Sequence, residues 1–276
     1  MIPDKYKQGV VVGLLFCVIA LCFLFVQLPD DRFHIYFLDV GQGDATFVKT
    51  PFGHKILIDG GPNNYVIEEL GKVLPFFDKT IDLVVLTHPH ADHIDGLVEV
   101  LKRFDVENVV MTGVYCGDST YLEFLRVLEE QGVRVFFAES GMGFLFGDVE
   151  VGVLYPAESF FGKSFENINN SSLVVKVSYG DENILFTGDL EMEGESELAE
   201  SGLLDNVDVY QVGHHGSKTA SSLPFLAKIS PEIAVISCGK DNKFNHPHVE
   251  ALENLEMAGV EEVYRTDLEG TVEFVY

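Results

Sequence analysis

Clusters of histidine are the part of this sequence best able to do chemistry. Seven of the nine histidines fall in three short groups, and the isolated His34 and His54 are expected to pack or to lie at the surface. The groups are His88, His90 and His93; His214 and His215; and His246 and His248. Imidazole and carboxylate donors suit divalent ions such as Zn²⁺ or Mn²⁺. The clusters therefore predict a metal-dependent site.

The first cluster lies in THPHADH at residues 87–93, which has the spacing HxHxDH. His88 and His90 alternate along an extended segment that leaves a buried strand. Asp92 and His93 open the next helix, where Asp92 could also cap the helix N-terminus. A turn of this kind can hold one metal ion between His88 and His90 and a second between Asp92 and His93.

Two neighbouring cations need a shared anion, and the segment LFTGD at 185–189 offers one. Asp189 directly follows a strand and a glycine turn, which suits a carboxylate that bridges both ions. The segment VYQVGHHGS at 209–217 is another buried strand that ends in histidines. We favour His214 as the residue that completes the Asp92/His93 site, with His215 reaching the substrate or bracing a ligand. The opposite assignment stays open.

Strands and helices alternate around these residues. Apolar runs predict strands at 33–40, 45–50, 55–60 and 81–88, and apolar residues at helical spacing predict an amphipathic helix at 93–104. A strand-rich stretch follows, and strand–helix alternation resumes toward the C-terminus. This order predicts a layered α/β domain with sheets inside and helices outside.

The composition narrows the class of protein. The chain has 276 residues, of which 44 are acidic and 18 basic, for a formal net charge of −26. Its 47 % hydrophobic content excludes a disordered chain, and its length allows one large domain with a buried core. The charge argues against a protein that coats nucleic acid, because phosphate binding normally uses a basic face. It does not exclude an enzyme whose metal ions supply positive charge locally.

The four cysteines lack CxxC spacing, which argues against a cysteine-based zinc site. Cys17 and Cys22 fall in the apolar N-terminus. We expect Cys116 and Cys238 to be separate buried thiols, although an exported domain would allow one disulfide between them.

The N-terminus predicts a membrane anchor. Residues 9–28 carry no charge, and a helix of that length spans about 30 Å, the thickness of the hydrocarbon layer. Lysines precede this run and aspartates follow it, so the positive-inside rule makes 1–8 a cytoplasmic tail. The domain at 33–276 would then lie outside, after a linker at 29–32. We expect a single-pass protein of the cell membrane with an extracytoplasmic domain.

Seven segments together resemble the metallo-β-lactamase-fold hydrolases, and within them the hydrolase domain of the competence protein ComEC and its stand-alone relatives. The segments are FLDVGQGDATFV (37–48), ILIDGG (56–61), LTHPHADHIDGL (86–97), NNSSLVV (169–175), LFTGD (185–189), VGHHGS (212–217) and NHPHVEAL (245–252). This resemblance spans nearly all of 33–276 and implies a four-layer αββα sandwich with a dinuclear site at its edge.

The resemblance also implies a ligand set for two divalent metal ions, Zn²⁺ or Mn²⁺. His88, His90 and Asp189 would hold one ion; Asp92, His93, Asp189 and His214 (or His215) would hold the other. The broader superfamily has a third histidine in the first site, but no histidine occurs between residues 93 and 189 here. Asn169 or Asn170 takes its place, which leaves an open coordination position that suits a substrate oxygen.

Phosphodiester hydrolysis by a metal-bridging hydroxide, with DNA or another nucleic acid as substrate, is the activity that the resemblance implies. Asp92 or Asp189 would take the proton of the water, and His215 or His246 would stabilise the transition state or protonate the leaving group. Asp39, Asp44 and Asp59 would brace the metal loop through hydrogen bonds. The expected substrate contacts are Asn170, Ser217, Lys218, His246 and His248.

Two other classes of function compete with a nuclease. A small-molecule hydrolase that acts on a lactone, a β-lactam or a phosphocholine-type ester would share the metal site, and the acidic surface favours it. A non-catalytic binding module is disfavoured because the ligands are intact. One anchor cannot form a pore, so a ComEC-like role would need a separate channel protein as partner. The alternative is a surface nuclease.

Overall fold

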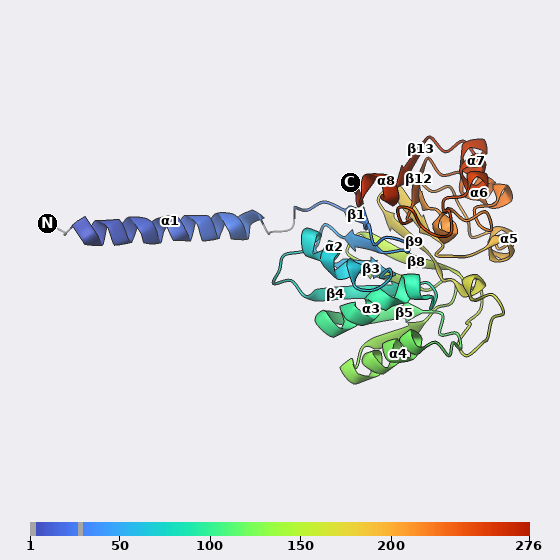
Figure 1. Ribbon diagram of the computed structural model, residues 1–276, viewed down its shortest axis with the longest axis horizontal. Coiled ribbons are helices and arrows are strands. Elements are labelled where there is room, and N and C mark those ends of the chain that lie inside the picture. Colours follow the sequence, from blue (N-terminus) through green and yellow to red (C-terminus); the bar gives the residue numbers. More distant parts are fainter. Residues whose placement is uncertain (1–3, 27–29) are drawn as a thin grey trace.

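Two seven-stranded β-sheets lie face to face, and helices cover the outer face of each sheet (Figure 1). The computed structural model describes residues 4–26 and 30–276. This four-layer αββα arrangement confirms the fold predicted from the sequence.

The first sheet has the strand order β14-β1-β2-β3-β4-β5-β6, in which β14 to β3 pair antiparallel and β3 to β6 pair parallel. Helices α2, α3 and α4 cover its outer face (Figure 1). The elements of this half are β1 (His34–Phe37), β2 (Thr46–Lys49), β3 (Lys55–Ile58), α2 (Tyr65–Val73), β4 (Thr80–Leu86), α3 (Ala91–Arg103), β5 (Asp105–Met111), α4 (Ser119–Gln131) and β6 (Arg134–Phe137).

The second sheet has the order β13-β12-β11-β10-β9-β8-β7, in which β10 to β13 pair parallel and β7 to β10 antiparallel. The last strand, β14, returns to the first sheet beside β1. The elements are β7 (Gly143–Phe146), β8 (Val149–Tyr155), η1 (Ile168–Ser171), β9 (Val174–Tyr179), β10 (Glu182–Phe186), α5 (Met192–Glu200), β11 (Val209–Gln211), η2 (Gly213–Gly216), α6 (Leu223–Ile229), β12 (Ile233–Ile236), α7 (Val249–Met257), β13 (Glu262–Arg265), α8 (Thr266–Glu269) and β14 (Val272–Val275).

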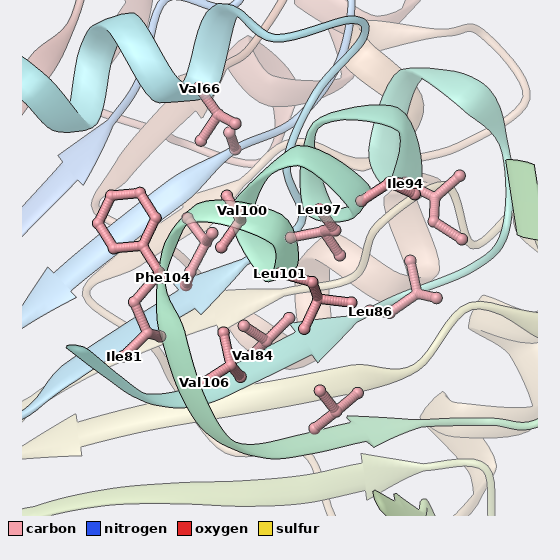
Figure 2. Packing of buried hydrophobic residues seen from close by; sticks show 14 of the residues in the cluster. Val66, Ile81, Val84, Leu86, Ile94, Leu97, Val100, Leu101, Phe104 and Val106 are labelled. Carbon is pink, nitrogen blue, oxygen red and sulfur yellow. The ribbon is translucent and has the colours of Figure 1, made fainter. Parts of the chain in front are cut away.

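Three hydrophobic clusters fill the three spaces between the four layers. One packs α2, α3 and α4 on the first sheet, one joins the two sheets, and one packs α5, α6 and α7 on the second sheet. Figure 2 shows the first of these, where Leu97 and Leu101 of α3 face Val84 and Leu86 of β4. The HxHxDH segment, which connects β4 to α3, is therefore anchored at one end by a buried strand and at the other by a helix with a buried face.

A pair of glycines lets α3 come unusually close to the loop after β3. A Cβ at Gly96 would lie 1.9 Å from the Gly60 carbonyl oxygen, and a Cβ at Gly60 would lie 2.5 Å from the Leu97 amide nitrogen. The contact is closed by hydrogen bonds from the Gly60 amide to the His93 carbonyl (2.8 Å) and from the Gly96 amide to the Gly61 carbonyl (3.0 Å). Glycine is required here because any side chain would push the helix away.

The membrane anchor predicted for residues 9–28 is not supported by the structure. Helix α1 runs over Asp4–Val26, with side chains described only for residues 9–19 and 21, and residues 27–29 lie outside the described part. Within the residues described, no helix is both long and apolar enough to span a membrane. Residues 1–3 of the predicted tail and residue 29 of the predicted linker also lie outside the described residues.

Candidate metal centre

The loops that follow β4, β10 and β11 meet at one edge of the sandwich. They carry His88 to His93, Asp189, and His214 with His215, and the carboxyl ends of parallel strands are where open α/β sheets place their ligands. His88, His93 and His215 are buried, with exposed fractions of 1 % or less. The structure therefore brings three of the predicted segments together.

Asp189 lies at the centre of these side chains, and each of its two oxygens faces two imidazoles. Its Oδ1 is 3.2 Å from His93 Nε2 and 3.5 Å from His215 Nε2. Its Oδ2 is 3.6 Å from both His88 Nε2 and His214 Nε2. A carboxylate in this position can share its oxygens between two cations.

Three buried polar atoms in this cluster make no hydrogen bond with any residue that the structure describes: His93 Nε2, His215 Nε2 and Asp189 Oδ1. Each buried polar atom left without a partner costs about 1–3 kcal/mol, so three in one place require an explanation. A cation between them would satisfy all three at once. The donor set, two imidazole nitrogens and a carboxylate oxygen, is the set that Zn²⁺ or Mn²⁺ binds, and the residues present therefore fit a metal.

The opposite ring nitrogens of the two histidines are held by buried carboxylates. His93 Nδ1 is 2.8 Å from Asp59 Oδ2. His215 Nδ1 is 3.0 Å from Asp44 Oδ1 and 3.1 Å from the Ser237 carbonyl oxygen. A carboxylate behind Nδ1 keeps the proton there and leaves Nε2 free for a metal. Asp44 and Asp59 thus brace the loop as expected, whereas Asp39 is exposed and accepts a bond from the Gly41 amide.

Among the residues that the structure describes, two groups of side chains offer ligand atoms that all lie within 4.8 Å of one another. One consists of Asp44, His93, Asp189 and His215, and the other of His88, His90 and Asp189. Because Asp189 belongs to both, this cluster of His and Asp residues fits a dinuclear site. Asp92 lies beside the first group, with Oδ2 at 3.4 Å from His215 Nε2.

Burial and charge set the protonation of the centre. Burial lowers the pKa of His93 and of His215, but the charge of Asp189 together with that of Asp59 (at His93) or Asp44 (at His215), and the hydrogen bonds to these carboxylates, outweigh burial and hold both pKa values well above the usual range. Burial raises the pKa of Asp189, yet His215, His93 and His88 hold it well below its usual value. Burial and the neighbouring His93 lower the pKa of His88. Positive charge is thus stabilised at His93 and His215, which both face Oδ1 of Asp189, and this is where a cation would supply it.

The two adjacent histidines occupy different positions from those favoured in the sequence. His215, rather than His214, lies with His93 and beside Asp92. His214 is 22 % exposed and faces the other oxygen of Asp189. The reason is the backbone: both residues have positive φ, 49° and 55°, and this turn directs the second ring inward.

The predicted substrate contacts divide between two places. His246 and His248 lie near the centre: the ring of His246 is 5.6 Å from that of His214 and 4.8 Å from that of His248. Burial and the neighbouring His215 lower the pKa of His246 to about 4. The Ser217 hydroxyl binds that of Thr219, and the Lys218 amide donates to His248 Nδ1.

Asn170 and Lys218 line a cavity of about 760 Å³ beside the centre, together with Glu166, Glu191, Glu193 and Glu197. Asn170 accepts a bond from the Glu191 amide and donates to Glu193, so it braces the loop rather than facing the cluster. Asn169 is the more buried of the pair, and its Oδ1 has no partner among the described residues.

Glu191 is a residue that the motifs did not single out. Its Oε1 lies 3.2 Å from His214 Nδ1 and accepts bonds from Asn169 Nδ2 (3.2 Å) and from the Thr219 hydroxyl (3.0 Å). Its position two residues after Asp189 is the one signal in the sequence that could have pointed to it.

The free cysteines of the described residues include Cys116 and Cys238, so the prediction that they do not pair is confirmed. Cys238 is buried, as predicted, whereas Cys116 is partly exposed. Burial and the neighbouring Asp267 raise the pKa of the Cys238 thiol to about 12.

Comparison with known proteins gives a consistent result. A family model described as "Metallo-beta-lactamase superfamily" matches residues 38–240. The chain is 32 % identical to ComE operon protein 3 of Bacillus subtilis (strain 168), over 98 % of this chain and 36 % of that protein. It is 31 % identical to Recombination protein 2 of Haemophilus influenzae (87 % and 29 % covered) and 32 % identical to Competence protein ComA of Neisseria gonorrhoeae (90 % and 33 % covered). The chain thus spans about a third of the length of these relatives.

Solved structures share the fold at low sequence identity. The metallo-beta-lactamase fold protein YhfI from Bacillus subtilis matches with a TM-score of 0.59 at 10 % identity, over 89 % of this chain and all of that chain. Tm1679, described as a metal-dependent hydrolase of the beta-lactamase superfamily, matches with a TM-score of 0.56 at 13 % identity, over 88 % and 98 % of the two chains.

Proposed function

The chain belongs to the metallo-beta-lactamase superfamily, and from this premise we propose that it is a dinuclear metal-dependent phosphodiesterase that cleaves DNA or another nucleic acid. The single observation that carries the metal-dependent part is that three neighbouring buried atoms, His93 Nε2, His215 Nε2 and Asp189 Oδ1, make no hydrogen bond with any described residue. The nucleic-acid part is supported by the names of the relatives, which refer to competence and recombination.

The ligand set that we propose differs in one point from the one favoured by the sequence. His88, His90 and Asp189 would hold the first ion. Asp92, His93, Asp189 and His215 would hold the second, with Asp44 behind His215 as its hydrogen-bond partner. The proximity of Asp92 Oδ2 to His215 Nε2 supports this choice, because the two atoms can reach one cation together.

Two divalent ions bound in such a site supply a lowered pKa for water and positive charge for a phosphoryl oxygen. The side chains of this protein would supply the remaining steps. Asp92, which is partly exposed, would accept the proton of the attacking water. His246, whose ring lies 5.6 Å from that of His214, would stand near the leaving group. Asp44 and Asp59 would hold the rings of His215 and His93 in a fixed orientation during the reaction.

A second candidate function is supported by the charge around the centre. Four glutamates line the neighbouring cavity of about 760 Å³ with Lys218 as the one lysine or arginine in its lining. A polyanion is repelled by such a wall, whereas a small neutral or cationic ester is not. The alternative is therefore a small-molecule hydrolase of the same fold, a lactonase, β-lactamase or phosphocholine-type esterase.

One substrate panel separates these functions. The full chain, purified in mild detergent and loaded with Zn²⁺ or Mn²⁺, is incubated with single-stranded DNA, bis-p-nitrophenyl phosphate, a chromogenic cephalosporin and a lactone. We expect cleavage of the first two, abolished in a His88→Ala/His90→Ala variant and kept in the matched His54→Ala variant. Turnover of the cephalosporin or lactone alone would support the small-molecule hydrolase, and diesterase activity retained by the double variant would refute the centre.

We also propose that residues 9–28 attach the domain at 33–276 to the cell membrane, beside a separate channel protein, with the domain outside the cytoplasm. The support is the uncharged sequence of this segment alone. Cell fractionation, followed by protease treatment of intact cells, tests both points. Recovery of the chain in the soluble fraction would refute the anchor, and protection of a membrane-bound domain would refute its outward orientation.

A further inference from the structure

His214 and His215 form a strained pair that sends two rings to opposite sides of one carboxylate. Both have backbone φ in the left-handed region, which non-glycine residues seldom adopt and which costs roughly 1–3 kcal/mol per residue. The turn is held by bonds from the His214 amide to the Gly188 carbonyl (3.1 Å) and from the Gly213 amide to the Tyr210 hydroxyl (2.9 Å). Because strained backbone of this kind is typical of functional sites, the turn indicates that both imidazoles have a function.

The two rings face different oxygens of Asp189. His215 Nε2 lies 3.5 Å from Oδ1, the oxygen that also faces His93, whereas His214 Nε2 lies 3.6 Å from Oδ2, the oxygen that also faces His88. The carboxylate therefore divides four imidazoles into two pairs. The pair on Oδ2 belongs to the side where the ligand set proposed above has three members and lacks a fourth.

Four histidines face Asp189 through Nε2, and three of them have a carboxylate near Nδ1, whereas His88 Nδ1 contacts the Thr87 hydroxyl instead (3.2 Å). Asp59 lies behind His93 and Asp44 behind His215. Behind His214, Glu191 Oε1 lies 3.2 Å from Nδ1 as an ion-pair contact, and Nδ1 is hydrogen-bonded to the Thr219 hydroxyl (3.3 Å), which itself donates to Glu191. A carboxylate in this place orients an imidazole toward a metal and makes it a better donor. Glu191 is itself held by bonds from Asn169 and Thr219, so its orientation is fixed.

We propose that His214 is the fourth protein ligand of the first metal ion, in the place of the histidine missing between residues 93 and 189, and that Glu191 is its positioning residue. The inference rests on the two-metal centre proposed above but not on the identity of the substrate. His214 lies outside the compact group of His88, His90 and Asp189, but its Nε2 is 3.6 Å from the same oxygen of Asp189 that faces His88. Each histidine of the GHHG turn then serves a different ion.

Metal binding measured without turnover tests the proposal. The full chain in detergent is loaded with Zn²⁺ against a competing chelator, and the two stepwise affinities are compared among variants. We expect His214→Ala to lower the affinity for the same ion whose binding His88→Ala weakens, by about 10–100-fold, and to leave the affinity for the other ion within about threefold of wild type. His215→Ala should lower the affinity for that other ion. The effects of His88→Ala and His214→Ala should be non-additive because they act on one site.

Cobalt substitution gives a second readout that reports the ligand directly. In the Co²⁺-loaded protein, each bound imidazole with a protonated Nδ1 contributes a shifted, exchangeable proton signal. His214→Ala should remove one signal. Glu191→Gln should shift that same signal, speed its exchange with solvent and weaken the first ion about tenfold. Glu200→Gln, at the far end of α5, is the matched control and should change none of these.

The outcomes separate this inference from the proposed function. Two ions bound by His214→Ala with unchanged affinities and a full set of signals would overturn the role of His214. An unchanged signal and affinity in Glu191→Gln would overturn the role of Glu191, and this variant also serves if His214→Ala fails to fold. If the wild-type chain binds no second ion, the dinuclear centre itself is refuted. Loss of diesterase activity alone bears only on the substrate.

Discussion

Replacing Gly96 with alanine should separate helix α3 from the loop that braces it. A Cβ at this position would lie 1.9 Å from the Gly60 carbonyl oxygen and 2.8 Å from its carbon, where about 3.5 Å is an ordinary contact. The obstacle is backbone and cannot rotate away. The helix must therefore move by roughly 1.6 Å, the difference between the two distances.

The expected loss of stability follows from two opposing effects. Overpacking of this kind costs about 1–3 kcal/mol, and contact with backbone places it at the upper end. Alanine in place of glycine gains up to about 1 kcal/mol in a helix interior. The net expectation is a loss of about 2 kcal/mol. Gly71→Ala in α2 is the matched control: no atom lies within 4 Å of its added Cβ, so it should gain about 0.5–1 kcal/mol.

Movement of α3 should also reach the metal centre. The first turn of the helix carries Asp92 and His93, and it is held by the bonds from Gly60 to the His93 carbonyl and from Asp44 to the Asp92 carbonyl. Both bonds must stretch when the helix lifts. We therefore expect Gly96→Ala to lower the affinity for the ion whose binding His215→Ala weakens, and to leave the affinity for the other ion unchanged.

Urea unfolding of both variants, followed by far-ultraviolet circular dichroism because the chain has no tryptophan, measures the stability difference. Chelator competition measures the two affinities. If Gly96→Ala unfolds at the same urea concentration as Gly71→Ala and keeps both affinities, the close approach of α3 to the loop after β3 has no energetic role, and the reasoning fails.

Four further expectations can be checked with the same material. Asp59→Asn removes the carboxylate behind a metal-facing histidine and should weaken zinc binding about 10–100-fold in chelator competition; unchanged affinity would contradict the bracing role. Leu101→Ala empties a fully buried site in the cluster of Figure 2 and should cost about 2–5 kcal/mol in urea unfolding, so a cost below about 1 kcal/mol would show that the cluster is loosely packed. Alkylation at pH 8, mapped by mass spectrometry, should modify Cys116 and leave Cys238 intact, because a thiol with a pKa of about 12 is ionised in only ~1 molecule in 10,000; equal labelling would contradict the burial of Cys238. For cleavage of single-stranded DNA, rising monovalent salt up to about 150 mM should leave KM unchanged or lower it, since salt screens repulsion from an acidic domain; a steep rise in KM would indicate a basic binding face instead.

The layers of the fold and most of the centre could be predicted from the sequence because their signals are local. The run at 81–88 is apolar on successive residues, as expected for a strand buried on both faces, and it becomes β4. The HxHxDH spacing lies within a single strand-to-helix turn, so the relative placement of His88 and His93 follows from local geometry. Asp189 could be assigned as the shared ligand because it directly follows a strand and a glycine turn, which together limit the directions in which its side chain can point.

The assignment of His214 and His215 could not be made from the sequence because it depends on tertiary contacts. The two residues are the same type and adjacent, and only the left-handed turn decides which ring points inward. That turn is stabilised by the Gly188 carbonyl and the Tyr210 hydroxyl, which belong to other elements. The same holds for Asn169 and Asn170, where a short 3₁₀ helix buries the first and leaves the second bonded to its neighbours in the loop.

The metal centre concentrates carboxylates that are paired with histidines. Asp44, Asp59, Asp189 and Glu191 approach one another through histidines, and the ion pairs found for them in the described residues involve histidine alone, without lysine or arginine. Protonated imidazoles can balance these carboxylates only while their Nε2 atoms carry protons, and the same atoms would have to lose those protons to bind metal. Divalent ions would balance the carboxylates in the protons' place and release the imidazoles as ligands. The excess of acid that disfavours a general nucleic-acid coat thus includes, at this edge of the sandwich, the carboxylates that divalent ions would balance.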